Sequence, residues 1–133
     1  MLNTFPSLLA FGLIGPFLLR LILGAIFLYA GYMKIARKGQ TAHILSSLNS
    51  PNPKVTAWIL GLVQTISGLG LIAGFLTQIS AAIILVISLS GLYVKIRHGE
   101  LIKQSLGFYL FAVAISASLI LTGAGFWAFD LPL

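Results

Sequence analysis

Two residues of opposite charge, Arg20 and Asp130, are the first candidates for a specific interaction in this chain. Arg20 lies inside a long apolar stretch, where a charged side chain costs roughly 2.5–3.5 kcal/mol at the centre of a membrane helix. One explanation for its presence is a structural ion pair with Asp130. The other is that the long apolar stem of Arg20 carries the guanidinium out to the lipid headgroups. Neither explanation gives Arg20 a catalytic role.

A second group of candidates is polar or small and lies on apolar stretches. Gly61, Gln64 and Gly68 fall on one face of a helix, where small residues let a neighbouring backbone approach and an amide can hydrogen-bond across the gap. Tyr109 and Ser116 form a similar, mildly polar stripe further along the chain, which could face Gln64. Two interpretations stay open for this set: a helix-packing face, or the polar wall of a cavity for a small molecule such as a quinone.

The residue types needed for most catalytic and metal sites are missing from the sequence or are scattered. The chain has no cysteine, which excludes disulfides and thiolate sites. His43 and His98 lie in short polar segments, and only Glu100 is near as a further ligand, which makes a poor metal site. No nucleophile is paired with a base, no carboxylates are paired, and no glycine loop suits phosphate. We therefore expect no catalytic site and no metal site.

The composition indicates the elements that position these residues. Of the 133 residues, 59% are hydrophobic and 8% are charged, against about 25% charged in an ordinary soluble domain. Four apolar stretches predict crossings at about residues 16–35, 55–76, 78–96 and 105–123 in one membrane domain, residues 1–133. The segment from Phe5 to Gly15 either lies in the membrane interface or extends the first crossing as a kinked helix. We predict an all-α, four-helix transmembrane bundle with antiparallel neighbours.

The net charge of +6 predicts the orientation of these crossings. In a soluble protein such a charge would suggest nucleic acid, but here the basic residues flank two short loops, so no nucleic acid partner is expected. Positive residues accumulate on the cytoplasmic side of membrane proteins. Both termini are therefore predicted to lie on the outer side, together with the turn at Thr77. The basic residues at the two loops are Lys34, Arg37, Lys38, Lys54, Lys95, Arg97 and Lys103.

Several short segments resemble the DoxX-like family of small membrane proteins. They are Leu18 to Leu21 with Gly24, Phe27 to Ile35, Leu62 to Gly68, Gly74 to Thr77, and Gly123 to Asp130. The resemblance spans nearly the whole chain. Where the family usually has glutamate this chain has Gln64, and where it often has arginine this chain has Gln78. A role that needs an intramembrane charge at those two positions therefore does not carry over.

The resemblance implies a four-helix bundle in the bacterial cytoplasmic membrane, with members tied to thiosulfate:quinone oxidoreductase and to oxidoreductase-associated complexes. The leading hypothesis is a non-catalytic membrane subunit or anchor of a redox complex, with a quinone as the candidate cofactor. Its expected partners are the lipid bilayer and either a redox protein or further copies of the chain. The alternatives are a carrier for a small or lipidic molecule along the Gln64 face, and a scaffold or assembly factor without a ligand.

Overall fold

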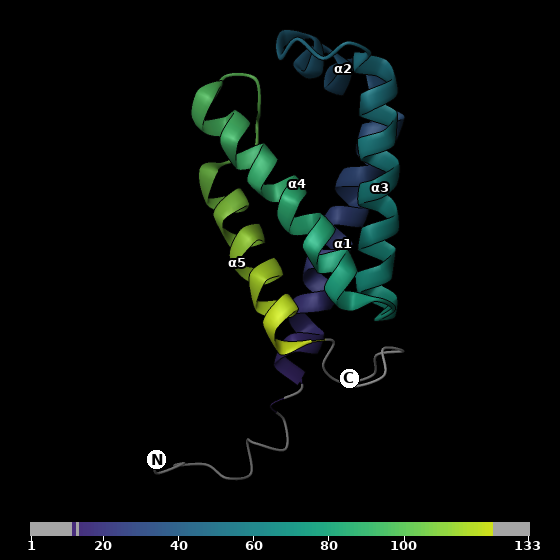
Figure 1. Cartoon of the computed structure of the whole chain (residues 1–133), viewed down its shortest axis with the longest axis vertical. Coiled ribbons are helices and arrows are strands. Elements are labelled where there is room, and N and C mark those ends of the chain that lie inside the picture. The colour runs from purple at the N-terminus through teal and green to yellow at the C-terminus, as the bar shows by residue number, and fades with distance from the viewer. Residues whose placement is uncertain (1–11, 13, 124–133) are drawn as a thin grey trace.

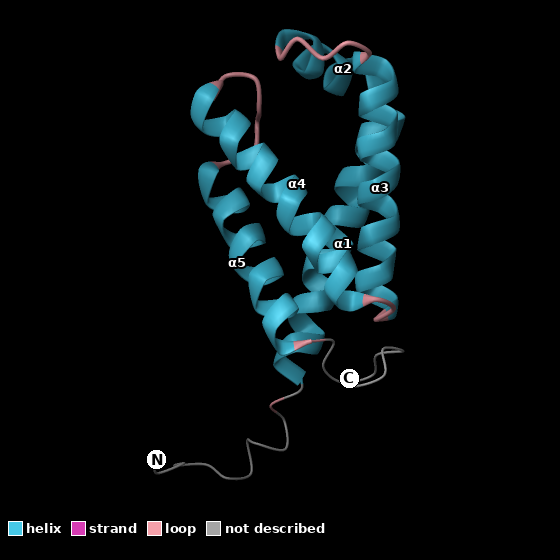
Figure 2. Cartoon of the chain, viewed as in Figure 1, coloured by secondary structure: helices cyan, strands magenta, loops and turns pink. Residues whose placement is uncertain are grey.

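The computed structural model of the chain describes residue 12 and residues 14–123, and all regular structure in that part is helical (Figures 1 and 2). The prediction of an all-α protein is confirmed there. The helices are α1 (Ile14–Ala36), α2 (Lys38–Ser47), α3 (Pro53–Ala73), α4 (Thr77–Arg97) and α5 (Leu106–Thr122). Three of them, α1, α3 and α4, are long and apolar enough to cross a membrane, and α5 is apolar but has 17 residues.

The helix boundaries follow local signals in the sequence. Pro16 lies in the first turn of α1, where its missing N–H removes no helical hydrogen bond. Pro53 begins α3, and Gly74 ends it in a left-handed conformation with φ of 69°. Ser105 caps α5 by accepting a hydrogen bond from the Phe108 N–H. Each predicted crossing thus coincides with a helix to within a few residues, while residues 5–11 lie outside the described part.

Helix α2 was not predicted, and it occupies the first loop. It is short and polar, and its residues carry no apolar periodicity, so a search for membrane crossings does not find it. Ala42 is its one buried residue, and the helix packs mainly against α3 (Figure 1). Asn49 then takes a positive φ of 57°, which turns the chain toward α3. The first loop is therefore an ordered cap on one end of the molecule, which we name the α2 end.

The four long helices form two antiparallel pairs, α1 with α3 and α4 with α5. The pairs converge at the turn between α3 and α4 and separate toward the α2 end (Figure 1). The very short turn between α3 and α4 predicts that the two helices are antiparallel neighbours. The two helices contact each other near the turn, where the side chain of Ser80 lies against Gly70, and their remaining contact is sparse.

A shared core joins the two pairs. Its residues are almost wholly buried and come from all four long helices: Leu23, Phe27, Leu71, Ala81, Ile84, Ala112 and Leu119. The outer faces are also apolar, and large side chains such as Ile66, Val86 and Phe111 are 59%, 63% and 73% exposed. Apolar side chains on both sides of a helix are expected where the surroundings are lipid.

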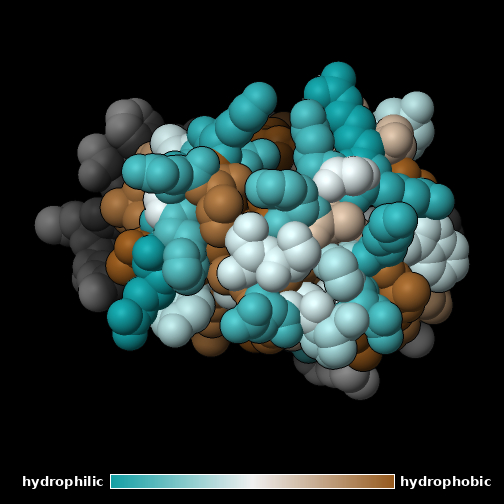
Figure 3. Space-filling model, turned by 90° about the horizontal axis from the view of Figure 1, so that it is seen from above, coloured by the Kyte–Doolittle hydropathy of each residue, from teal (hydrophilic) through white to brown (hydrophobic). Residues whose placement is uncertain are grey.

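Polar side chains gather at the α2 end, which Figure 3 views from above. Hydrophilic residues cover much of that face, with apolar residues between them. The basic residues at the ends of α1, α3 and α4 lie here, and Tyr32 and Tyr93 are exposed beside them. Aromatic and basic side chains at the end of an apolar bundle are typical of the level of lipid headgroups.

Candidate functional site

The buried face of α1 carries a cation near each end. Arg20, Phe27 and Lys34 follow one another at intervals of seven residues, so they lie along one side of the helix. Arg20 is 1% exposed, Phe27 is 2% exposed, and Lys34 is half-buried. Phe27 belongs to the shared core, so apolar side chains separate the two charged groups.

Lys34 and Gln64 form the polar contact at the α2 end of this face. The Nζ of Lys34 donates a hydrogen bond to the Oε1 of Gln64 at 2.6 Å, and Gln64 is 3% exposed. Side chains of a helix tilt toward its N-terminus, so Lys34 inclines back along α1 into the molecule. Gln64 lies on an antiparallel helix and inclines the other way, which lets the two groups meet. The ammonium group is thus held at the junction of α1 and α3, near the α2 end.

The two glycines beside Gln64 lie where α3 touches α1. A Cβ atom on Gly68 would be 2.6 Å from the Leu28 nitrogen and 2.8 Å from the Gly24 oxygen. One on Gly61 would be 2.8 Å from a side-chain carbon of Ile35. The two distances from Gly68 are to backbone atoms of α1, and they are too short for any side chain at that position. The face that carries Gly61, Gln64 and Gly68 is therefore filled by α1.

The other predicted polar stripe is engaged elsewhere. The ring of Tyr109 packs on Gly91 of α4 and makes an edge contact with Phe108, with ring centroids 5.4 Å apart. Phe108 in turn stacks on Phe27 at 6.5 Å. Ser116 is fully buried and donates a hydrogen bond to the Ala112 oxygen of its own helix at 2.6 Å. Of the described residues, the one that hydrogen-bonds Gln64 is Lys34, on α1.

Arg20 lies at the opposite end of α1, near the start of the helix. Its guanidinium carbon is 5.3 Å from the centre of the Phe17 ring, a cation–π distance. The side chain is almost wholly covered by neighbouring residues. Asp130 lies outside the described residues, so the ion pair between Arg20 and Asp130 stays a prediction.

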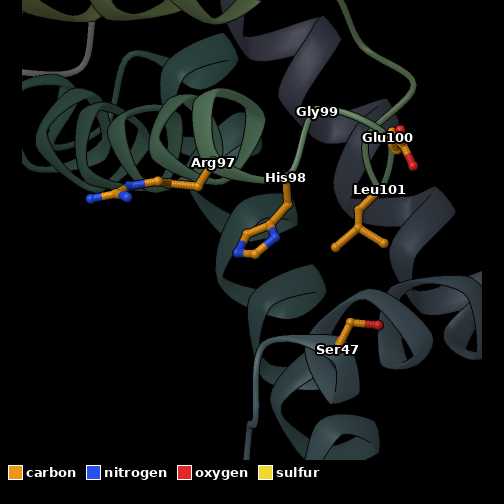
Figure 4. A pocket seen from close by; sticks show the side chains of 6 residues that line it. All are labelled: Ser47, Arg97, His98, Gly99, Glu100 and Leu101. Carbon is orange, nitrogen blue, oxygen red and sulfur yellow. The ribbon is translucent and has the colours of Figure 1, made fainter.

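An open pocket of about 460 Å³ lies at the α2 end, between Ser47 and the loop that follows α4 (Figure 4). His98 and Leu101 extend toward Ser47, while Arg97 points away from it. Lys95 orders this loop, because its Nζ donates to the carbonyl oxygens of Gly99 at 2.9 Å and Ile102 at 2.7 Å. Among residues 14–123, no three histidine or carboxylate side chains gather as a metal site would require.

In a comparison with protein-family models, residues 15–94 match the model described as DoxX. The chain belongs to the DoxX family. The DoxX match begins in α1 and ends in α4, so it includes Arg20, Lys34 and Gln64 and leaves out α5 with Tyr109 and Ser116. Membership and the three long apolar helices identify this DoxX protein as a multi-pass membrane protein in a lipid environment. Comparisons with curated proteins and with solved structures found no match.

Sequence reasoning missed Lys34 as a site residue in this DoxX protein, because a lysine at a helix end was interpreted only as a topology signal. Its position seven residues after Phe27 and fourteen after Arg20 was the available clue. That spacing places Lys34 on the buried face of α1. Arg37 and Lys38, one turn further on, lie outside that helix and are exposed.

Proposed function

We propose that this DoxX-family protein is a non-catalytic membrane subunit or anchor of a redox complex in the bacterial cytoplasmic membrane. In this proposal the chain crosses the bilayer four times, and the α2 end faces the cytoplasm. The redox link rests on what the family resemblance implies. The observation that favours a structural role over a carrier is the filled interior, where Phe27, Leu71, Ile84 and Leu119 close the space between the helix pairs.

The fourth crossing in this proposal is α5. Its 17 residues span about 25 Å at 1.5 Å per residue, somewhat less than the roughly 30 Å of a bilayer core. However, α5 packs along α4, which is long enough to cross, and it contributes Ala112 and Leu119 to the shared core. A helix that lies beside a crossing helix shares its depth, and a small mismatch is accommodated by local thinning of the bilayer.

A quinone would need hydrogen-bond donors beside an apolar slot. Lys34 and Gln64 have donors, but α1 fills the Gln64 face, because Gly61 and Gly68 lie against it. The described residues therefore do not fit a quinone on that face. In the proposed complex the quinone is bound with residues of the partner, and the exposed apolar faces of the helices are the surface that this partner contacts.

Co-purification tests this proposal. The tagged chain, expressed at its natural level in its own host and solubilised in mild detergent, should elute with a stoichiometric protein that carries a redox cofactor. Deletion of the gene should lower quinone reduction by isolated membranes, and the wild-type gene should restore it. A chain that elutes alone, together with unchanged quinone reduction after deletion, would contradict the proposal and favour a carrier or a scaffold.

A further inference from the structure

The ammonium group of Lys34 is incompletely satisfied by the part of the chain that the structure describes. A lysine ammonium has three N–H donors. Within residues 14–123, the one hydrogen bond that this group makes is the 2.6 Å bond to Gln64. Gln64 is a neutral amide, so it offers an acceptor but no opposite charge. Two donors and a full positive charge therefore remain for another group.

Opposite charge is scarce at this end of the molecule. Glu100 is the one carboxylate among the described residues, and it lies exposed in the loop after α4. It makes no salt bridge with Lys34 in that part of the chain. Buried or half-buried charges in proteins are normally paired, because transfer from water is unfavourable for an isolated ion. The other carboxylate of the sequence, Asp130, lies outside the described residues and is predicted to pair with Arg20. We therefore expect the counter-charge of Lys34 to come from outside the chain.

The surroundings of Lys34 indicate where that counter-charge lies. Arg37 and Lys38 follow within one turn and are exposed, and Lys54 lies in the first turn of α3, also toward the α2 end. Together these cations create a positive field that attracts anions from the surrounding medium. Tyr29 and Tyr32, 65% and 62% exposed, lie on the same last turns of α1, and exposed tyrosines are enriched at the depth of lipid headgroups. The anions at that depth are lipid phosphates.

We propose that Lys34, positioned by Gln64, binds the phosphate of an anionic phospholipid in the leaflet at the α2 end. Gln64 holds the ammonium at the junction of α1 and α3, and the half-buried side chain leaves its remaining donors to the phosphate oxygens. A charge-assisted hydrogen bond of this kind is stronger than one between neutral groups. The site does not depend on a redox partner, so it can be tested independently of the proposed function.

Native mass spectrometry of the purified full-length chain tests the site with phosphatidylglycerol and phosphatidylcholine as probes. The wild-type chain should retain phosphatidylglycerol preferentially. Lys34→Gln should weaken that retention about tenfold, equivalent to roughly 1.4 kcal/mol. Lys38→Gln is the matched control, since it removes the same charge from an exposed position four residues away. Equal losses in the two variants would overturn the proposal and leave a general electrostatic attraction.

A second variant, Gln64→Glu, tests whether a loss of lipid binding could be caused by a loss of folding. It places a carboxylate beside Lys34 within the chain, so the lysine has an internal ion pair and no longer needs the lipid. This variant should keep or raise the melting temperature and still lose the preference for phosphatidylglycerol. Unchanged lipid preference in Gln64→Glu would contradict the proposed site.

A further measurement distinguishes a lipid headgroup from a free anion as the ligand of Lys34. Inorganic phosphate at millimolar concentration should not displace the bound phosphatidylglycerol, because the acyl chains hold the headgroup at the membrane surface. Complete displacement by inorganic phosphate would show that Lys34 binds a soluble anion, and the lipid assignment would be wrong.

Discussion

The two cations on the buried face of α1 are held in different ways. Arg20 is enclosed at one end with the Phe17 ring 5.3 Å away, and Lys34 is half-buried at the other with an amide oxygen at 2.6 Å. A guanidinium is planar and stacks on aromatic rings, whereas an ammonium is a compact charge with three donors. The two residues are therefore expected to respond differently to substitution.

The first prediction concerns the acceptor of Lys34. Gln64→Leu should lower the free energy of unfolding in mild detergent by about 1–2 kcal/mol, more than the roughly 0.6 kcal/mol average for polar contacts in membrane bundles, because the donor is charged. Thermal unfolding measures this change. Gln40→Leu, at an exposed position of α2, is the control and should leave the melting temperature nearly unchanged. Equal shifts in both variants would show that the bond contributes little.

The second prediction tests the ion pair that the sequence predicts between Arg20 and Asp130. Arg20→Ala and Asp130→Ala should each lower the melting temperature in detergent, and the double variant should lose less than the sum of the two, because each single change removes the opposite charge from the residue that remains. Arg20→Lys should also destabilise the protein, since lysine cannot form two parallel hydrogen bonds with a carboxylate. Strictly additive effects in the double-mutant cycle would rule out the pair.

At the residue scale, spacing along a helix indicated which side chains are buried, whereas residue type alone did not. The helical interval between Gly61, Gln64 and Gly68 predicts that the three share one face of a helix, and all three are buried on α3. The partner of Gln64 was not predicted, because nothing in the local sequence specifies which helix lies opposite. Only the register of α1 against α3 brings Lys34 to it.

At the scale of elements, glycines determine how closely α1 and α3 approach. Gly24 meets Gly68, and Gly31 meets Gly61, so each close contact joins one glycine from each helix. Backbone atoms touch at both points. This arrangement makes the pair of helices sensitive to the addition of a single methyl group.

The third prediction tests that sensitivity. Gly68→Ala should destabilise the protein by about 1–3 kcal/mol, the usual range for overpacking, because its Cβ would lie 2.6 Å from the Leu28 nitrogen. Gly107→Ala in α5 is the matched control, since the nearest atom to its Cβ would be Ser105 Oγ at 3.9 Å. That variant should be neutral or slightly stabilising through the helix preference of alanine. Circular dichroism during thermal unfolding compares the two.

The helices themselves were largely predictable, and their arrangement was less so. Long apolar stretches bounded by Pro16, Pro53 and Gly74 located α1 and α3 to within about three residues. Helix α2 was not predicted, because it is stabilised by packing against α3 and its own sequence has no apolar periodicity. The separation of α3 and α4 away from their turn was not predicted either. A short turn specifies that two helices meet there, but it does not specify the angle between them.

At the scale of the whole molecule, charge is distributed unevenly between the two ends. Seven of the eight basic residues lie toward the α2 end, and Arg20 alone lies toward the other. That bias predicts a cytoplasmic α2 end. The same bias places both termini on the outer side. The even number of proposed crossings agrees with this placement, because it requires both termini to lie on one side.

The fourth prediction tests this orientation with single cysteines in a chain that has none of its own. Cysteines at Ser47 and at Gln78, both exposed and at opposite ends, should react differently with a membrane-impermeant thiol reagent in intact cells. The Gln78 site should be labelled, and the Ser47 site should be labelled only after the membrane is opened. The reverse pattern would mean that the orientation is inverted.

The pairing of the helices has a consequence for how the protein is made. The closest contacts join helices whose long segments follow one another in the chain, α1 with α3 and α4 with α5, and the two pairs share fewer contacts. Domains and their parts form from the N-terminus during synthesis. The first pair can therefore close on its glycines while the ribosome is still adding the second. We therefore expect biogenesis to proceed as two hairpins inserted in turn, with the shared core forming last.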